Sequence, residues 1–442
     1  MKTKEMKGIT LVALVVTIVV LLILAGVSIN LVLGNNGIIA KAKDAETKSA
    51  EATQNDLIGM NELAQQLEEK INGSAGSGSG NGGAGGSGAG TKVPAEATAE
   101  TAPYFPDNTF TKKEGTIDTG LVIQDASGNE YVWVVVPRTT AVYATTGLGK
   151  TTFTDADYTS IENDLKEYTK TYRGSTSYSD VYYPDDKNVG WFADATAYNN
   201  LKNSMLKSVY ENGGFYVGRY EAGIIENRTS KSATNSDGKY TIEGMPTPLS
   251  KADAYPYTYV TRTQAQNLAS NVNSGTKTSG LMFGVQWDLV LAFMHNKGNI
   301  EDSILTSNST TIGNYRDSVF QLSQTGQYAV YSNYSLSSTW NPTTTATANF
   351  VDSSRNKIAQ SSNGNGILVT TGTSEKNKVM NIYDVAGNVI EWTLEKTSDT
   401  NYPCARRGGY YDSTGSGIPA ADRNGSSTDY SVVFFGFRVS LF

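Results

Sequence analysis

A stretch near the C-terminus, residues 381–393, reads Asn-Ile-Tyr-Asp-Val-Ala-Gly-Asn-Val-Ile-Glu-Trp-Thr and decides the fold expected for the chain. Two short elements follow it, Arg407-Gly408-Gly409 and Gly436-Phe437-Arg438-Val439. The glycines permit tight turns and close approach of the backbone, and we expect Trp392 and Phe437 to be core anchors. Because charged side chains are seldom buried unless paired, we predict that Glu391 and Arg438 brace the core.

These elements resemble the central and closing motifs of the formylglycine-generating-enzyme (sulfatase-modifying factor) family. Phe215–Glu221 and Gly280–Met294 occupy the places of two earlier family elements, so the likeness spans about residues 120–442, with an insertion at about 140–210. The resemblance implies an α+β head over 104–442, a large variant of the C-type-lectin fold with much irregular structure. It also implies that the quoted motifs are framework rather than site.

The cysteine and histidine counts argue against the family's oxidase activity. Those oxidases bind copper through two closely spaced cysteines between the Arg-Gly-Gly and Gly-Phe-Arg elements, and thiolate pairs suit Cu(I). Here residues 410–435 contain no cysteine, and the single one, Cys404, lies before Arg407. The single histidine, His295, ends a helix-like stretch and cannot by itself supply the iron centre of a related branch. We therefore predict a non-catalytic domain that requires no cofactor.

The interval in which the family has its two cysteines is residues 410–435 here. It is rich in Tyr, Ser, Asn, Gly and Asp, which are typical of adaptable recognition surfaces. The family also includes variable proteins of diversity-generating retroelements, whose C-terminal segment is mutated at exposed, ligand-facing positions, and this stretch is similar in position and residue types. An ordinary polar loop over the scaffold is the alternative. The predicted ligand-binding residues are Tyr410, Tyr411, Asp412, Ser413, Asp422, Arg423, Asn424, Ser426, Asp429 and Tyr430.

Calcium is the one metal that the resemblance suggests. Lectin-like folds often carry structural Ca²⁺ held by Asn, Glu and backbone oxygens. By resemblance, Asn388 and Glu391 are the candidate ligands. A chain with one cysteine can form no internal disulfide, so a bound ion would be useful to an extracellular domain.

The N-terminus predicts a membrane anchor. Three lysines within residues 1–7 precede an uncharged run over 8–40, whose core, residues 9–33, is apolar and long enough to span a bilayer, which takes about 20 residues. Lysines on this side hold the N-terminus in the cytoplasm. The order of these features resembles type IV prepilins and pseudopilins. That likeness implies cleavage by a prepilin peptidase between Gly8 and Ile9, methylation of Ile9, and packing of the helix against other pilin subunits.

Two features depart from an ordinary major pilin. The family usually has Glu at the fifth mature position, where this chain has Ala13; a buried terminal amine without a partner is costly. A Gly/Ser-rich flexible tether also stands where pilins have a sheet. The expected organisation is a leader at 1–8, a membrane and stem helix at 9–72, a linker at 73–103 and the head at 104–442. A plain membrane anchor is the alternative for the first segment.

Together these patterns predict a bacterial cell-surface protein, a minor pilin or pilus-associated adhesin, whose non-catalytic lectin-fold head binds an extracellular glycan or protein. The formal charge of −7 gives no indication of nucleic-acid binding. The alternatives are a structural pseudopilin of a secretion or uptake system and, against the cysteine count, a formylglycine-generating oxidase.

Overall fold

The computed structural model describes residues 103–442, apart from 175–176, 231–233, 332–338 and 362–363. The described residues belong to one compact unit that ends at Phe442. The predictions for the leader (with Gly8 and Ile9), the membrane helix over 9–33, the stem and nearly all of the linker lie outside the described residues. Within the described part, no helix is long and apolar enough to cross a membrane.

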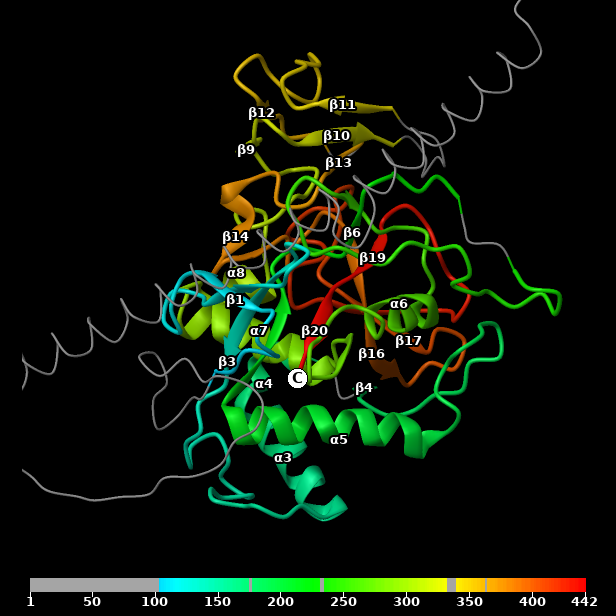
Figure 1. Cartoon of the computed structure of the whole chain (residues 1–442). Helices are drawn as coiled ribbons and strands as arrows, with labels where there is room; N and C mark the ends of the chain where they lie inside the picture. The colour runs from blue at the N-terminus through cyan, green and yellow to red at the C-terminus, as the bar shows by residue number, and fades with distance from the viewer. Residues whose placement is uncertain (1–102, 175–176, 231–233, 332–338, 362–363) are drawn as a thin grey trace, which may run out of the picture. The chain divides into compact units, whose positions relative to one another are not determined.

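The described chain is mixed α and β with long irregular connections, as predicted (Figure 1). The helices are α3 (Asp155–Tyr168), α4 (Lys170–Arg173), α5 (Ala195–Asn212), α6 (Arg262–Ala269), α7 (Gly284–Asn296), α8 (Asp302–Thr306) and the 3₁₀ turn η1 (Glu375–Asn377). The strands are β1 (Thr111–Glu114), β2 (Val122–Gln124), β3 (Glu130–Val135), β4 (Tyr178–Ser179), β5 (Gly214–Gly218), β6 (Gly223–Ile224), β7 (Tyr255–Pro256), β8 (Ser279–Leu281), β9 (Phe320–Gln321), β10 (Gln327–Val330), β11 (Trp340–Pro342), β12 (Asn356–Lys357), β13 (Ile367–Val369), β14 (Lys378–Val379), β15 (Ile382–Tyr383), β16 (Ile390–Thr397), β17 (Cys404–Arg407), β18 (Arg423–Ser426), β19 (Phe435–Phe437) and β20 (Val439–Leu441).

The larger sheet has six antiparallel strands in the order β1-β2-β3-β5-β20-β8. Its centre, β3, is a buried run of β-branched and aromatic residues, the composition that suits a strand covered on both faces. The Trp133 ring of β3 packs edge-on against Tyr216 of β5, with 4.9 Å between the ring centroids. The β-branched and aromatic runs at 131–136 and 214–221 predict strands, and the structure has β3 in the first run and β5 over residues 214–218 of the second.

Helix α7 is buried from Gly284 to Met294 and contacts both β3 and β16. The sequence predicts a helix over 285–294, with Trp287, Val290, Leu291 and Met294 on a shared face, and α7 confirms it. Its first two backbone amides, at Gly284 and Val285, donate to the Asp180 carboxylate at 2.7 and 3.0 Å. A carboxylate at this end offsets the partial positive charge of the helix N-terminus.

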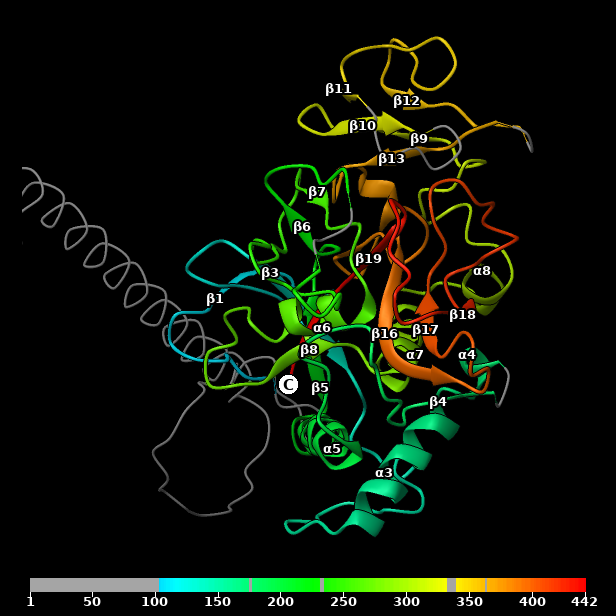
Figure 2. The ribbon, with the colours of Figure 1, turned by 90° about the vertical axis from the view of Figure 1, so that its right-hand side faces the viewer.

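The segment predicted as an insertion, about 140–210, is part of the core. It forms α3, α4, β4 and most of α5, and α3 and α5 lie side by side in both views (Figures 1 and 2). The buried side of α5 includes Tyr198, whose hydroxyl donates to the Leu394 carbonyl of β16 at 2.9 Å. Helix α5 begins after an Asp194 cap and ends at Gly213, which has φ +71°; both are ordinary terminal residues for a helix.

Candidate ligand-binding site

The predicted loops flank a second sheet of five strands, in which β16 pairs with β17, β17 with β18, and β16 in parallel with β19. Strand β4 joins it at the end of β16. In the register, Arg407 stands opposite Glu391 and Arg423, whereas Arg406 stands opposite Trp392 and Asn424. Paired residues share a face and neighbours along a strand alternate. We name the two sides the α7 face, which carries Arg407, and the Arg406 face.

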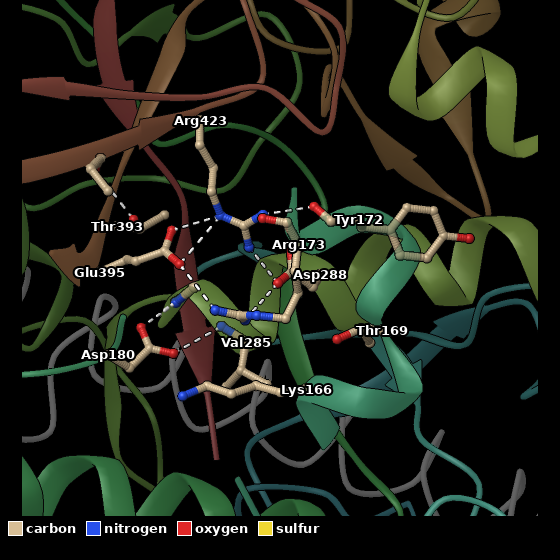
Figure 3. A network of polar contacts seen from close by, with 12 residues as sticks. Lys166, Thr169, Tyr172, Arg173, Asp180, Val285, Asp288, Thr393, Glu395 and Arg423 are labelled. Carbon is tan, nitrogen blue, oxygen red and sulfur yellow. Dashed lines mark hydrogen bonds and ion pairs between the residues drawn. The ribbon is translucent and has the colours of Figure 1, made fainter. Parts of the chain in front are cut away.

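On the α7 face, three arginines surround two buried carboxylates. Asp288 of α7 accepts hydrogen bonds from Arg173 at 2.9 Å and from Arg423 (Figure 3). It accepts a third from Arg407 at 3.0 Å. Glu395 of β16 pairs with Arg423 at 3.1 Å and lies 3.6 Å from a nitrogen of each other arginine. Burial raises the pKa of Glu395, and Arg423 and Arg407 oppose that shift. The cluster ties α4, α7, β16, β17 and β18 together.

This cluster corrects the prediction that Arg423 contacts a ligand. The Arg423 side chain is 4% exposed, and besides the two carboxylates it donates to the backbone carbonyls of Tyr172 and Arg173. Its guanidinium is therefore used within the protein. The cause is the register, which places Arg423 opposite Arg407 on the covered side of the sheet.

Glu391 and Arg438, predicted to brace the core, are buried and pair with each other. Both side chains are 1% exposed, and Arg438 Nη2 lies 2.7 Å from Glu391 Oε1. The same guanidinium donates to the carbonyls of Gly218 and Tyr383, so it joins β5 of the first sheet to β16 of the second. Trp392 and Phe437 are buried, as predicted. Gly387 has φ +76°, and a Cβ there would lie 2.3 Å from the Asn314 carbonyl oxygen.

The calcium site predicted at Asn388 and Glu391 does not fit the geometry. The Glu391 carboxylate is occupied by Arg438. The Asn388 side-chain oxygen accepts hydrogen bonds from the Asn314 side chain at 3.0 Å and from the Val369 amide at 3.1 Å. Oxygens already committed to protein donors are not available to a hard cation, so these two residues are framework.

The chain's one cysteine and one histidine lie on different elements, β17 and α7. Cys404 is buried, and burial raises the pKa of its thiol to about 11. His295 lies at the end of α7, as expected, with Nδ1 2.9 Å from the Ile300 carbonyl oxygen. No group of three or more His, Cys, Asp or Glu side chains among the described residues could hold a metal ion.

On the Arg406 face, four aromatic rings lie next to the Arg406 side chain. The Tyr410 ring stacks on Phe434 at 4.5 Å, and the Tyr430 ring meets Phe435 edge-on at 5.0 Å. Phe434 and Phe435 are in turn 5.2 Å apart. The Arg406 guanidinium lies 5.4 Å from the centroid of the Phe435 ring, so charge and aromatic surface adjoin.

The remaining predicted residues divide by exposure. Tyr411, Ser413 and Ser426 are buried, at 1%, 7% and 6% exposed, which corrects their assignment as ligand contacts, because a covered side chain offers no surface. Asp412 and Asp429 are half-buried and accept hydrogen bonds from the Gly366 amide and from Ser427 respectively.

Four predicted residues stay accessible around Arg406. Asn424 and Tyr430 are exposed, and Tyr410 and Asp422 are half-buried. Burial lowers the pKa of Arg406, and the charges of Asp422, Tyr410, Tyr430 and Tyr178 oppose that shift. We call Arg406, Tyr410, Asp422, Asn424 and Tyr430 the Arg406 surface.

Arg406 itself was missed by the sequence reasoning, although a signal existed. Arg406 and Arg407 are consecutive in a strand, and consecutive strand residues point to opposite faces. If Arg407 belongs to the buried framework motif, its neighbour must face away from it. That argument requires knowing that the segment is a strand, which the short sequence Cys-Ala-Arg-Arg does not by itself indicate.

Comparison with known proteins gives little beyond this geometry. No protein-family model matches the chain, and no curated protein matches it. Among solved structures, CarF aligns with a TM-score of 0.23 and 12% identity over 70% of this chain and 85% of its own. Treponema denticola variable protein 1 aligns with a TM-score of 0.22 and 11% identity over 70% and 84%. Likenesses at this level do not establish a shared fold, so the resemblances to pilins and to formylglycine-generating enzymes stay predictions.

Proposed function

We propose that the chain is a non-catalytic binding protein whose Arg406 surface contacts an extracellular glycan or protein, and that a pilin-like N-terminus presents it at the bacterial cell surface. The observation that carries the binding role is the Arg406 surface. The Arg406 guanidinium lies over Phe435, the accessible rings of Tyr410 and Tyr430 pack on Phe434 and Phe435, and Asn424 is the cross-strand neighbour of Arg406. Tyrosine provides a large, rigid contact area at low entropic cost.

The scaffold under this surface is suited to holding it still. Tyr410 and Tyr430 come from connections, where binding residues are frequent, but their rings rest on Phe434 and Phe435. The strands between them are fixed from the opposite side by the buried arginine–carboxylate cluster. A preordered surface loses less freedom when a ligand binds.

Alanine at both Tyr410 and Tyr430 is expected to weaken binding by about tenfold or more, because aromatic anchors carry much of an interface's free energy. The full chain in detergent micelles would be applied to a glycan array and to a panel of extracellular proteins, and affinity measured for the strongest binder. Tyr158→Ala on α3 is the matched control, since Tyr158 lies on an element outside the site. Equal affinities for the double variant and the unaltered protein would remove the Arg406 surface from the proposal.

The surface-display part of the proposal has a separate test. In cells that contain a prepilin peptidase, we expect the mature protein to begin at a methylated Ile9, and Gly8→Val to prevent this cleavage, because the peptidase requires a small residue before the cut. Mass spectrometry of the N-terminal peptide measures both. An N-terminus at Met1 in the unaltered protein would contradict pilin-type processing and leave the plain-anchor alternative.

A further inference from the structure

We propose that the ligand of the Arg406 surface is an acidic saccharide, whose carboxylate is bound by Arg406; this inference rests on the proposed binding function. The argument starts from how the arginines of the second sheet are used. Arg407 and Arg423 each bind two buried carboxylates. Among the described residues, no hydrogen bond to the Arg406 side chain and no ion pair is present, and its Nε is buried without a partner.

An unpartnered Nε alone would not distinguish Arg406, because Arg138 shares this property. What distinguishes Arg406 is its surroundings. Its guanidinium lies over Phe435, with Tyr410 and Tyr430 close enough to act on its pKa. A guanidinium presents a planar fork of donors that matches a carboxylate. Partial removal from water strengthens such a pair relative to one on an open surface.

Asp422 is not the carboxylate that pairs with the Arg406 guanidinium. It is half-buried beside Arg406 and acts on its pKa, yet within the described ranges the two form no ion pair within 4.0 Å. Burial raises the pKa of the Asp422 carboxyl, and Arg406, Arg407 and Arg423 oppose that shift. Asp422 thus holds an acceptor for the hydroxyls of a ligand, while the ligand's carboxylate pairs with the Arg406 guanidinium.

The other groups favour a saccharide over an acidic peptide. A sugar ring has apolar C–H faces and a rim of hydroxyls that both donate and accept. Tyr410 and Tyr430 supply flat aromatic surface for the faces, and the Tyr430 side chain is 39% exposed. Asp422 accepts from hydroxyls, and the exposed Asn424 amide donates and accepts. An acidic peptide offers few hydroxyl donors for Asp422 and no apolar sugar-ring faces for the two tyrosines.

The test pairs each acid with its ester. The full chain in detergent micelles is applied to an array of glucuronate- and sialate-terminated glycans, each printed beside its methyl ester, together with a tetraglutamate peptide. We expect the acids to bind and the esters to bind about ten- to hundredfold more weakly, the range for losing a charged hydrogen-bonded pair. Arg406→Gln should reduce acid binding to the level of the ester, and Arg406→Lys should fall between the two.

The controls separate the possible outcomes. Arg138→Gln should leave acid binding unchanged, and circular dichroism should show that Arg406→Gln is folded. Equal binding of acids and esters, or unchanged acid binding in folded Arg406→Gln, would overturn the inference. Arg406-dependent binding of tetraglutamate without binding of the acidic glycans would overturn it in favour of a peptide ligand. If the tyrosine double variant still abolishes binding in any of these cases, the proposed function stands while this inference fails.

Discussion

Alanine at Asp288 is expected to lower the free energy of unfolding of the head by about 3–5 kcal/mol, the usual result of breaking a buried ion pair. The substitution removes one carboxylate from three arginines, which then surround Glu395 alone. Arg407 is fully buried in this cluster, so its charge has no route to water. The Asp288→Asn variant should lose nearly as much, because an amide keeps the shape but not the charge.

Urea unfolding followed by tryptophan fluorescence measures this effect, since Trp287 and Trp392 are buried in the described core. The control is Glu167→Ala, which breaks the ion pair with Lys170. Those two side chains are 73% and 71% exposed, and exposed pairs contribute little to stability. If Asp288→Ala and Glu167→Ala unfold at the same urea concentration, the cluster does not hold the sheet to α7.

Methionine at Arg438 is expected to destabilise the head by a similar amount at pH 7 and by clearly less at pH 5. Arg438 is the cation among three buried carboxyls, Glu221, Asp384 and Glu391. Burial raises the pKa of all three, that of Asp384 to about 6, and Arg438 opposes each shift. Without the guanidinium these pKa values should rise further, so the carboxyls will take up protons in the folded state.

The direction of the pH effect follows from proton binding. A carboxyl whose pKa is raised by folding keeps its proton in the folded state after the unfolded chain has released it, so stability falls as pH rises from the unfolded pKa to the folded one. For Asp384 in the unaltered protein that interval lies between about 4 and about 6. Urea unfolding of both proteins across pH 4.5–7.5 should give a steeper decline for Arg438→Met; parallel curves would show that Arg438 does not govern these carboxyls.

Much of the framework could be predicted because its signals are local. A β-branched and aromatic run indicated β3, an apolar face indicated α7, and the rule that buried charges are paired indicated that Glu391 and Arg438 brace the core. The cap on α7 could not be predicted, since Asp180 is remote from Gly284 in the sequence. The packing of α3 and α5 into the core likewise depends on contacts such as Tyr198 with Leu394, which no local pattern encodes.

The sequence predicted the residue types of the candidate site, but not which of those side chains are exposed and which are buried. Tyr410 and Tyr411 are adjacent and chemically identical, yet the first lies at the surface and the second packs against Tyr331 in the interior. Arg423 and Asn424 differ in the same way: Arg423 belongs to the buried ion cluster, whereas Asn424 is exposed to solvent. For Arg423 and Asn424, the neighbour that faces out is set by strand register, and register depends on the partner strand. Tyr410 and Tyr411 lie in the connection after β17, where tertiary contacts rather than register decide which ring is covered.

The place of β20 in the first sheet has a consequence for how the protein is made. Strand β20 stands between β5 and β8, so Val217 pairs with Ser440 and Leu281 with Val439. The strands on either side are synthesised long before β20, and until it arrives they present unpaired edges, which are prone to pair with other chains. All of β16–β19 must also emerge first. The head is therefore expected to assemble as one event after β20 has left the ribosome, rather than strand by strand as its residues are synthesised.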